Sequence, residues 1–261
     1  MNETTTQQAE TRLTIVSRIL VTQARPTDEK SPYFDLARQY NVTVDFRPFI
    51  QIQGVQARDF RRQKVNILDH TAVIFTSRNA IDHFFRVCLE MRVDVPGDMK
   101  YFCISEQTAN YLQKYIIIRK RKIFSGTKTA AELLELIKKH KTEKFLFPCS
   151  NIRRNDIPEF MDMSGFHFTE AVMYETVSTD LSDLDVHSFD AIAFFSPSGV
   201  VSLLHNFPDF KQEAIRLAAF GPTTAKAITN AGLIVDIEAP LPNAPSMTGA
   251  LELYIKRANN L

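Results

Sequence analysis

The sequence has few cysteines, little net charge and no long apolar run, and each shortage excludes a class of protein. Cys88, Cys103 and Cys149 stand singly, with no Cys-x-x-Cys pair. We therefore expect neither a disulfide framework nor a zinc site, but reduced thiols in a reducing compartment. The formal net charge is +1, which is too small to drive binding to a nucleic-acid backbone, so no nucleic-acid partner is expected.

The chain also lacks segments that would direct it to a membrane or a secretory route. No apolar stretch approaches the roughly 20 residues that a membrane span needs, and the N-terminal MNETTTQQAETR has no basic-then-apolar order. We expect a cytoplasmic protein without a membrane partner. The first residues are rich in Thr, Gln and Glu and cannot offset the entropy of ordering, so a frayed tail is predicted over residues 1–17.

Short β-branched or aromatic runs then alternate with amphipathic segments. This alternation is typical of parallel sheets with right-handed crossover helices, so the sequence predicts an α/β protein. With 261 residues and 44% hydrophobic content, the chain is long enough for two domains. The predicted strands are residues 19–22, 42–52, 72–75, 101–104, 116–118, 145–147, 166–177, 191–195, 217–220 and 233–237.

The order of motifs repeats once along the chain. The segment VIFTSRNAI resembles IAFFSPSGV, which makes Ser77 equivalent to Ser196, 119 residues later. A Thr-Ala pair that opens the next helix also recurs, at Thr108 and at Thr224. Recurrence at nearly constant spacing predicts two related α/β halves of roughly 120 residues each.

Hydroxyl side chains gather where the predicted strands lead into helices. In a parallel sheet these junctions share one edge, where helix N-termini offer free N–H groups and a partial positive charge. Any one Ser or Thr there can be a helix cap, which stabilises by about 1 kcal/mol. Matching junctions in both halves favour a cleft of uncharged donors for carboxylates. The junction residues are Thr76, Ser77, Thr108, Ser196, Ser198, Thr223 and Thr224.

Other patterns of catalytic or ligand-binding sites are missing. Neither the P-loop order nor Gly-x-Gly-x-x-Gly follows a predicted strand, so nucleotide binding is not expected. The six histidines show no metal-ligand spacing. Cys149 follows Pro148 at a strand end, and no Cys-His arrangement can be built around it, so we expect a small buried residue rather than a nucleophile.

Four segments, in order, resemble one known family. They are LFPCSNIRRN, VMYETV, FFSPSGV and FGPTTAKA, and together they resemble the uroporphyrinogen-III synthases, with the likeness running from about Ile19 to Ile255. The resemblance implies two α/β domains joined by a two-stranded β-linker, one of them discontinuous. The implied boundaries are residues 18–49 with 178–261 for the discontinuous domain, 56–171 for the second domain, and 50–55 and 172–177 for the linker strands.

The resemblance also implies a reaction. The family closes hydroxymethylbilane, a linear tetrapyrrole rich in carboxylates, into uroporphyrinogen III with loss of water and inversion of the terminal pyrrole ring, which is cyclising hydro-lyase chemistry. Loss of hydroxide leaves a cation that the pyrrole nitrogen stabilises, so the enzyme mainly imposes geometry, in a cleft between its domains. This implies a site of hydroxyls and amides without metal or cofactor. We expect a monomer.

The family's site residues can be carried over position by position. The tyrosine of its second linker strand matches Tyr174, which implies that Tyr174 hydrogen-bonds or protonates the departing hydroxyl; an aromatic packed between domains is the alternative. Arg154 matches a basic position whose planar guanidinium can clamp a propionate, with a surface ion pair as the alternative. The implied carboxylate donors are Thr76, Ser77, Asn79, Thr108, Ser196, Ser198, Thr223 and Thr224.

The sequence departs from the family pattern at two places. Cys-Ile-Ser-Glu replaces a usual Val-Gly, so that Glu106 puts a negative charge near Thr108, and Gln23 stands where many members have arginine. Two alternatives to the enzyme stay open. One is a two-domain protein that closes on a small anion without chemistry, and the other is a family member that retains the fold but not turnover.

Overall fold

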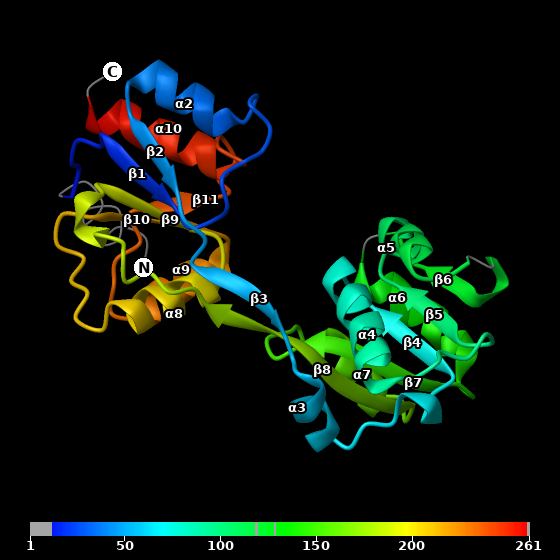
Figure 1. The fold of residues 1–261 in the computed structure, drawn as a ribbon. Coiled ribbons are helices and arrows are strands. Elements are labelled where there is room, and N and C mark those ends of the chain that lie inside the picture. Colours follow the sequence, from blue (N-terminus) through cyan, green and yellow to red (C-terminus); the bar gives the residue numbers. More distant parts are fainter. Residues whose placement is uncertain (1–11, 118–119, 128, 260–261) are drawn as a thin grey trace. The chain divides into compact units, whose positions relative to one another are not determined.

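The computed structural model describes residues 12–117, 120–127 and 129–259. The chain forms two compact α/β units (Figure 1), unit 1 from Met1–Gln51 and Val177–Leu261 and unit 2 from Ile52–Thr176. The chain passes from one unit to the other within β3 (Ile50–Gly54) and again within β8 (His167–Ser178). The predicted α/β class is confirmed, with two mainly parallel sheets.

Unit 1 contains a five-stranded parallel sheet in the order β11-β10-β9-β1-β2. Alternate side chains of its short apolar strands enter two separate cores, because successive residues of a strand face opposite sides of the sheet. Ile19 and Val21 of β1 join one core, and Leu20 joins the other. The strands are β1 (Arg18–Val21), β2 (Thr43–Phe46), β9 (Ala191–Phe194), β10 (Arg216–Phe220) and β11 (Ile237–Ala239).

Two pairs of helices cover the faces of this sheet. Helices α2 (Pro32–Tyr40) and α10 (Met247–Ala258) supply apolar side chains to the core that contains Ile19. Helices α8 (Pro197–Asn206) and α9 (Pro222–Asn230) pack on the opposite face, in the core that contains Leu20. The sheet is thus covered on both sides, as the apolar residues of its central strands β1, β9 and β10 require.

Unit 2 contains a six-stranded sheet in the order β3-β8-β7-β4-β5-β6. Helices α3 (Ala57–Arg62), α4 (Arg78–Met91) and α5 (Glu106–Tyr111) pack on one face. Helices α6 (Ala130–Ile137) and α7 (Asp156–Met163) pack on the other. The remaining strands are β4 (Ala72–Phe75), β5 (Lys100–Cys103), β6 (Ile123–Ser125) and β7 (Lys144–Ser150).

The predicted internal repeat appears in the strand orders. The order β11-β10-β9-β1-β2 in unit 1 corresponds to β6-β5-β4-β7-β8 in unit 2, and all these neighbours pair in parallel. Strand β3 is an addition at the edge of unit 2. It runs antiparallel to β8. The N–H of Thr179 donates to the C=O of Phe49 (2.9 Å), and the N–H of Val55 donates to the C=O of Met173 (3.0 Å). Residue numbers thus increase along one strand as those of the paired residues decrease along the other.

Three predicted strands differ from the structure. The run 42–52 is two strands separated at Pro48, which has no N–H to donate to a ladder. Residues 116 and 117 are not in a strand, since Ile116 N–H bonds to the C=O of Leu112 at the end of a helical turn; residue 118 lies outside the described residues. Residues 233–236 precede β11, because Leu233 N–H closes the end of α9 on Ile228 C=O (3.1 Å).

The predicted frayed tail also differs from the structure over residues 12–17. The N–H of Thr14 donates to the hydroxyl of Tyr254 (3.3 Å), and Val16 is 1% exposed within the core of unit 1. Arg12 forms an ion pair with Asp236 (2.8 Å). The apolar contact of Val16 and this ion pair offset the entropy of ordering the segment. The rest of the predicted tail, residues 1–11, lies outside the described residues.

Asp236 is the centre of a buried polar cluster in unit 1. Its side chain is 3% exposed and accepts from the guanidinium groups of Arg12 (2.8 Å) and Arg216 (3.1 Å). It also accepts from the amide of Gln212 (2.8 Å) and from the backbone N–H of Leu217 (3.0 Å). A buried carboxylate is stable only with such complete pairing, so this cluster ties the N-terminal segment to the sheet.

Within the described residues, no helix is long and apolar enough to cross a membrane.

We expect Asp236→Asn to destabilise the protein by about 3 kcal/mol, because Arg12 and Arg216 would be left near a neutral amide in a buried cluster. Urea unfolding followed by circular dichroism measures this. The matched control is Asp45→Asn, which breaks an exposed ion pair with Arg18 and should change the free energy of unfolding by about 0.5 kcal/mol. Equal effects of the two substitutions would contradict the assignment of Asp236 as the buried anchor.

Candidate functional site

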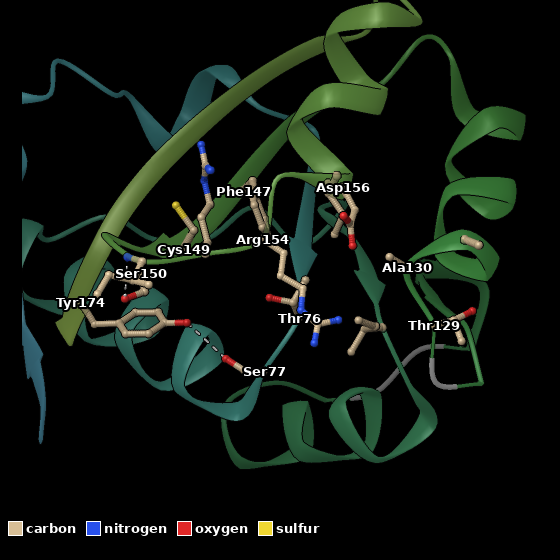
Figure 2. Close-up of a pocket in the computed structure, with 15 residues that line it drawn as sticks. Thr76, Ser77, Thr129, Ala130, Phe147, Cys149, Ser150, Arg154, Asp156 and Tyr174 are labelled. Atoms are coloured by element: carbon tan, nitrogen blue, oxygen red, sulfur yellow. Dashed lines mark hydrogen bonds between the residues drawn. The ribbon is translucent and has the colours of Figure 1, made fainter. Parts of the chain in front are cut away.

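Unit 2 has a cavity of about 610 Å³ at the carboxyl edge of its sheet (Figure 2). The cavity lies where β4 and β7 are neighbours. Helix α4 follows β4 onto one face of the sheet, whereas α7 follows β7 onto the other. Connections that leave neighbouring strands toward opposite faces open a crevice between them, which is where open α/β sheets bind ligands.

The loop after β4 contributes Thr76 and Ser77 to the cavity. Ser77 has extended backbone angles and its hydroxyl oxygen accepts the N–H of Ala80 (3.1 Å), so it caps α4. The same hydroxyl lies 3.3 Å from the phenolic oxygen of Tyr174. Ser77 therefore begins the helix and also presents a hydroxyl to the cavity, so the capping and donor interpretations of this residue are compatible.

The loop after β7 contributes the positive charge. Arg153 pairs with Glu170 and also donates to the side-chain oxygen of Asn155 (2.6 Å), so its charge is already neutralised. Arg154 is exposed, and within the described part of the chain its guanidinium has no ion-pair partner. Figure 2 shows its side chain reaching into the cavity. Asp156 also lines the cavity. The guanidinium of Arg154 and the carboxylate of Asp156 therefore lie near the first turn of α7.

Tyr174 lies on β8 and reaches the cavity with its hydroxyl. The side chain is 8% exposed, and its ring stacks on the imidazole of His83, with centroids 5.0 Å apart and planes at 17°. Burial raises the pKa of Tyr174 above its ordinary value, so the phenol keeps its proton at neutral pH. Burial, with the nearby charge of Arg86, lowers the pKa of His83, so the stacked imidazole is neutral there.

The prediction that Cys149 is a small buried residue is confirmed. Cys149 lines the cavity wall but is 2% exposed, and burial raises its pKa to about 11, so almost no thiolate exists near neutral pH. Cys88 and Cys103 are also buried and free. Among the residues that the structure describes, no cluster of His, Cys, Asp or Glu could hold a metal ion.

Two residues expected at the site lie elsewhere in unit 2. Thr108 is buried at the third position of α5, and its hydroxyl is 3.1 Å from that of Ser105, which is the actual cap of this helix. Asn79 is exposed in the first turn of α4 and does not line the cavity. The structure therefore brings Thr76, Ser77, Arg154 and Tyr174 together and leaves these two residues outside.

The remaining expected residues belong to unit 1, at the carboxyl edge of its own sheet. Ser196 caps α8 by accepting the N–H of Gly199 (3.3 Å), as Ser77 caps α4, so the predicted equivalence of the two serines is confirmed. Ser198 follows in the first turn of α8 and is half-buried. Thr223 is exposed and Thr224 is 1% exposed in the first turn of α9.

Some cavity residues were not predicted from the sequence. Thr129 caps α6 and Ser150 ends β7, and both line the cavity. The order Thr-Ala-Ala-Glu at 129–132 is a capping-box signal that could have marked Thr129 as a helix start. His83 gave no signal, because it meets the site through a ring contact with a residue 91 positions later.

A sequence model described as Uroporphyrinogen-III synthase HemD matches residues 31–249 of this chain. The chain belongs to the uroporphyrinogen-III synthase family. Among curated relatives, the uroporphyrinogen-III synthase of Chlorobaculum parvum is 24% identical over 251 residues, covering 91% of this chain and 99% of its own. The uroporphyrinogen-III synthase of Saccharomyces cerevisiae is 29% identical over 127 residues, covering 42% of this chain and 46% of its own.

Solved structures of the family share the fold. The uroporphyrinogen-III synthetase of Helicobacter pylori superposes with a TM-score of 0.57 at 18% identity, covering 92% of this chain and 99% of that one. A mutant uroporphyrinogen III synthase from Thermus thermophilus gives 0.54 at 16% identity, covering 94% and 99%. The family assignment made from four short motifs is thereby confirmed.

Proposed function

We propose that this chain is an enzyme that dehydrates and closes hydroxymethylbilane to uroporphyrinogen III, with inversion of the terminal pyrrole ring. Membership of the uroporphyrinogen-III synthase family supports the reaction. The observation that carries the proposal is the cavity of unit 2, where a buried, protonated tyrosine lies beside hydroxyl donors and an arginine that has no ion-pair partner among the described residues. In class, the reaction is that of a cyclising hydro-lyase.

Tyr174 is the residue that assists departure of the hydroxyl group. A hydroxide is a poor leaving group, and a hydrogen bond or proton from a phenol lowers the barrier to its loss as water. The raised pKa of Tyr174 keeps that proton available at neutral pH. Ser77, 3.3 Å from the phenolic oxygen, holds the hydroxyl in place and can return a proton to it.

The donors around the tyrosine hold substrate carboxylates. Arg154 offers an open guanidinium that can bind a carboxylate through two parallel hydrogen bonds. Thr76 and Thr129 add neutral hydroxyls, and the N-termini of α4 and α6 add partial positive charge. A carboxylate-rich chain held at several points loses the freedom to close by direct joining of its ends, which would give the non-inverted isomer.

The equivalent edge of unit 1 supplies further carboxylate donors in this proposal. Its residues Ser196, Ser198 and Thr223 lie at the starts of α8 and α9 and are not buried, whereas Thr224 is 1% exposed, as buried as its counterpart Thr108. Thr108 and Asn79 are left out, because neither lies at the cavity. The proposed enzyme acts as a cytoplasmic monomer without cofactor.

Incubation of the purified protein with hydroxymethylbilane should yield mainly uroporphyrinogen III. Chromatographic separation of the isomers after oxidation to porphyrins measures this, with a no-enzyme sample as control for spontaneous closure. Only the symmetric isomer, formed at the spontaneous rate, would overturn the proposal. Retained binding of the tetrapyrrole in that case would instead support the two-domain binding protein.

Tyr174→Phe should lower kcat at least about tenfold with little change in KM, because it removes a proton donor that acts in the transition state. The acid form of a group is present below its pKa and lost above it. Since the pKa of Tyr174 is raised above the ordinary value of 10.0, wild-type kcat should show no loss from this group between pH 7 and about pH 9. A step in wild-type kcat near pH 8 that is absent from Tyr174→Phe would contradict the raised pKa, whereas an unchanged kcat in Tyr174→Phe would contradict the role of proton donor.

Arg154→Gln should raise KM about tenfold with a smaller effect on kcat, since it removes an ion pair with a substrate carboxylate. The matched control is Arg58→Gln, which removes an exposed arginine of α3 that does not line the cavity. Steady-state kinetics at low ionic strength compare the two. A change in KM of the same size in both variants would mean that Arg154 contributes only to the overall charge.

A further inference from the structure

Arg86, in the middle of α4, forms hydrogen bonds just beyond the end of β3, with β8 and with the ring of His83, all near Tyr174. Its Nη2 donates to the C=O of Val55 (2.9 Å) and to the C=O of Met173 (3.0 Å). Its Nε donates to Nδ1 of His83 (3.1 Å), and its Nη1 pairs with Glu90 (2.8 Å). Every nitrogen of this half-buried guanidinium is therefore bonded, which fixes its position.

Two of these bonds act on Tyr174 through its immediate surroundings. The C=O of Met173 belongs to the peptide group that joins Met173 to Tyr174, so the bond from Arg86 fixes the plane from which the tyrosine side chain projects. The guanidinium only donates, so Nδ1 of His83 must accept, which places the imidazole proton on Nε2. That same ring stacks on the phenol.

The backbone next to Arg86 is shaped to admit the guanidinium. A Cβ added at Gly54 would lie 2.8 Å from Cζ of Arg86 and 2.9 Å from its Nε and Nη2. Only glycine leaves room for the planar group to lie against β3 while it bonds the carbonyl groups. Gly54 and Arg86 are thus a matched pair, although neither lines the cavity.

We propose that Arg86 is a positioning residue that holds the hydroxyl of Tyr174 in its place in the cavity, acting through the ring of His83 and the peptide group of Met173. This inference rests on the role proposed for Tyr174. Arg86 does not line the cavity, so its effect on turnover passes through the tyrosine. The residues that hold Tyr174 share one helix, since Ser77, His83 and Arg86 all belong to α4 or its cap. One rigid element thereby positions the hydroxyl, the ring and the backbone of Tyr174.

A double-mutant cycle tests whether Arg86 acts through the hydroxyl of Tyr174. In the wild-type background, Arg86→Gln should lower kcat about tenfold and change KM less than about twofold. In the Tyr174→Phe background, the same substitution should lower kcat less than about twofold, because the group that it positions is already absent. An equal loss in both backgrounds, or a loss confined to KM, would overturn the inference.

Two further variants guard against a trivial loss of folding. Gly54→Ala keeps the guanidinium but displaces it, and should reproduce the kcat loss in the same direction and with the same dependence on Tyr174. Arg92→Gln removes an exposed arginine at the C-terminal end of the same helix and should leave kcat unchanged. A kcat loss in Arg92→Gln equal to that in Arg86→Gln would also overturn the inference, since any arginine of the helix would then have the effect.

Fluorine NMR gives a readout that does not require turnover. The chain has seven tyrosines, and in fluorotyrosine-labelled protein the resonance of Tyr174 is the one missing from Tyr174→Phe. Arg86→Gln should shift this resonance, and Arg92→Gln should leave it in place. An unshifted resonance in Arg86→Gln would overturn the positioning role, whereas failure to form the inverted isomer would overturn only the proposed reaction.

Discussion

The order reversal between β4 and β7 is the constraint on which the site of unit 2 depends. Strands β4 and β7 are parallel neighbours, yet their following helices pack on opposite faces of the sheet. No connection can then cross the gap between the two strand ends, and a crevice is left at the carboxyl edge. Helix starts border this crevice, so their caps and free N–H groups come with the topology. The strand order therefore provides the cavity, and the side chains of the surrounding loops provide its hydrogen-bond donors.

Much of this arrangement could be predicted because its signals are local. The Thr-Ser pair after β4 and the Ser-Pro-Ser after β9 mark helix starts in the sequence itself, and their spacing revealed the repeat. The apolar strands were equally visible, since a strand buried on both faces reads as a continuous apolar run. The predicted strand boundaries were less accurate where the chain leaves one sheet or ends a helix. At Pro48 it leaves one sheet, and around Leu233 an apolar residue closes a helix instead of starting a strand.

The rest depended on contacts between residues far apart in the chain. Thr108 has the residue type and spacing of a site residue, but Ser105 three positions earlier is the cap, and the threonine turns inward. The stacking of His83 on Tyr174 joins a helix to a strand that lies beyond three intervening strands in sequence. Gly54 gives no sequence signal of its role, and only the position of the guanidinium shows that a larger residue there would displace it. Such relations have no period or motif by which a single sequence could disclose them.

The two units also differ in how their strands are distributed along the chain, and this bears on synthesis. Unit 2 is one continuous segment, so all its strands leave the ribosome before the second half of unit 1 emerges. Unit 1 pairs β1 with β9, and the hydroxyl of Thr22 bonds to the C=O of Ala193, 171 residues later. Its first strands must therefore wait with unpaired edges while a complete neighbour folds, and closing that long loop is the slow step of contact formation. Nascent chains long enough for residue 176 to have left the ribosomal exit tunnel should thus carry a folded unit 2 and an incomplete unit 1 that chaperones can still bind.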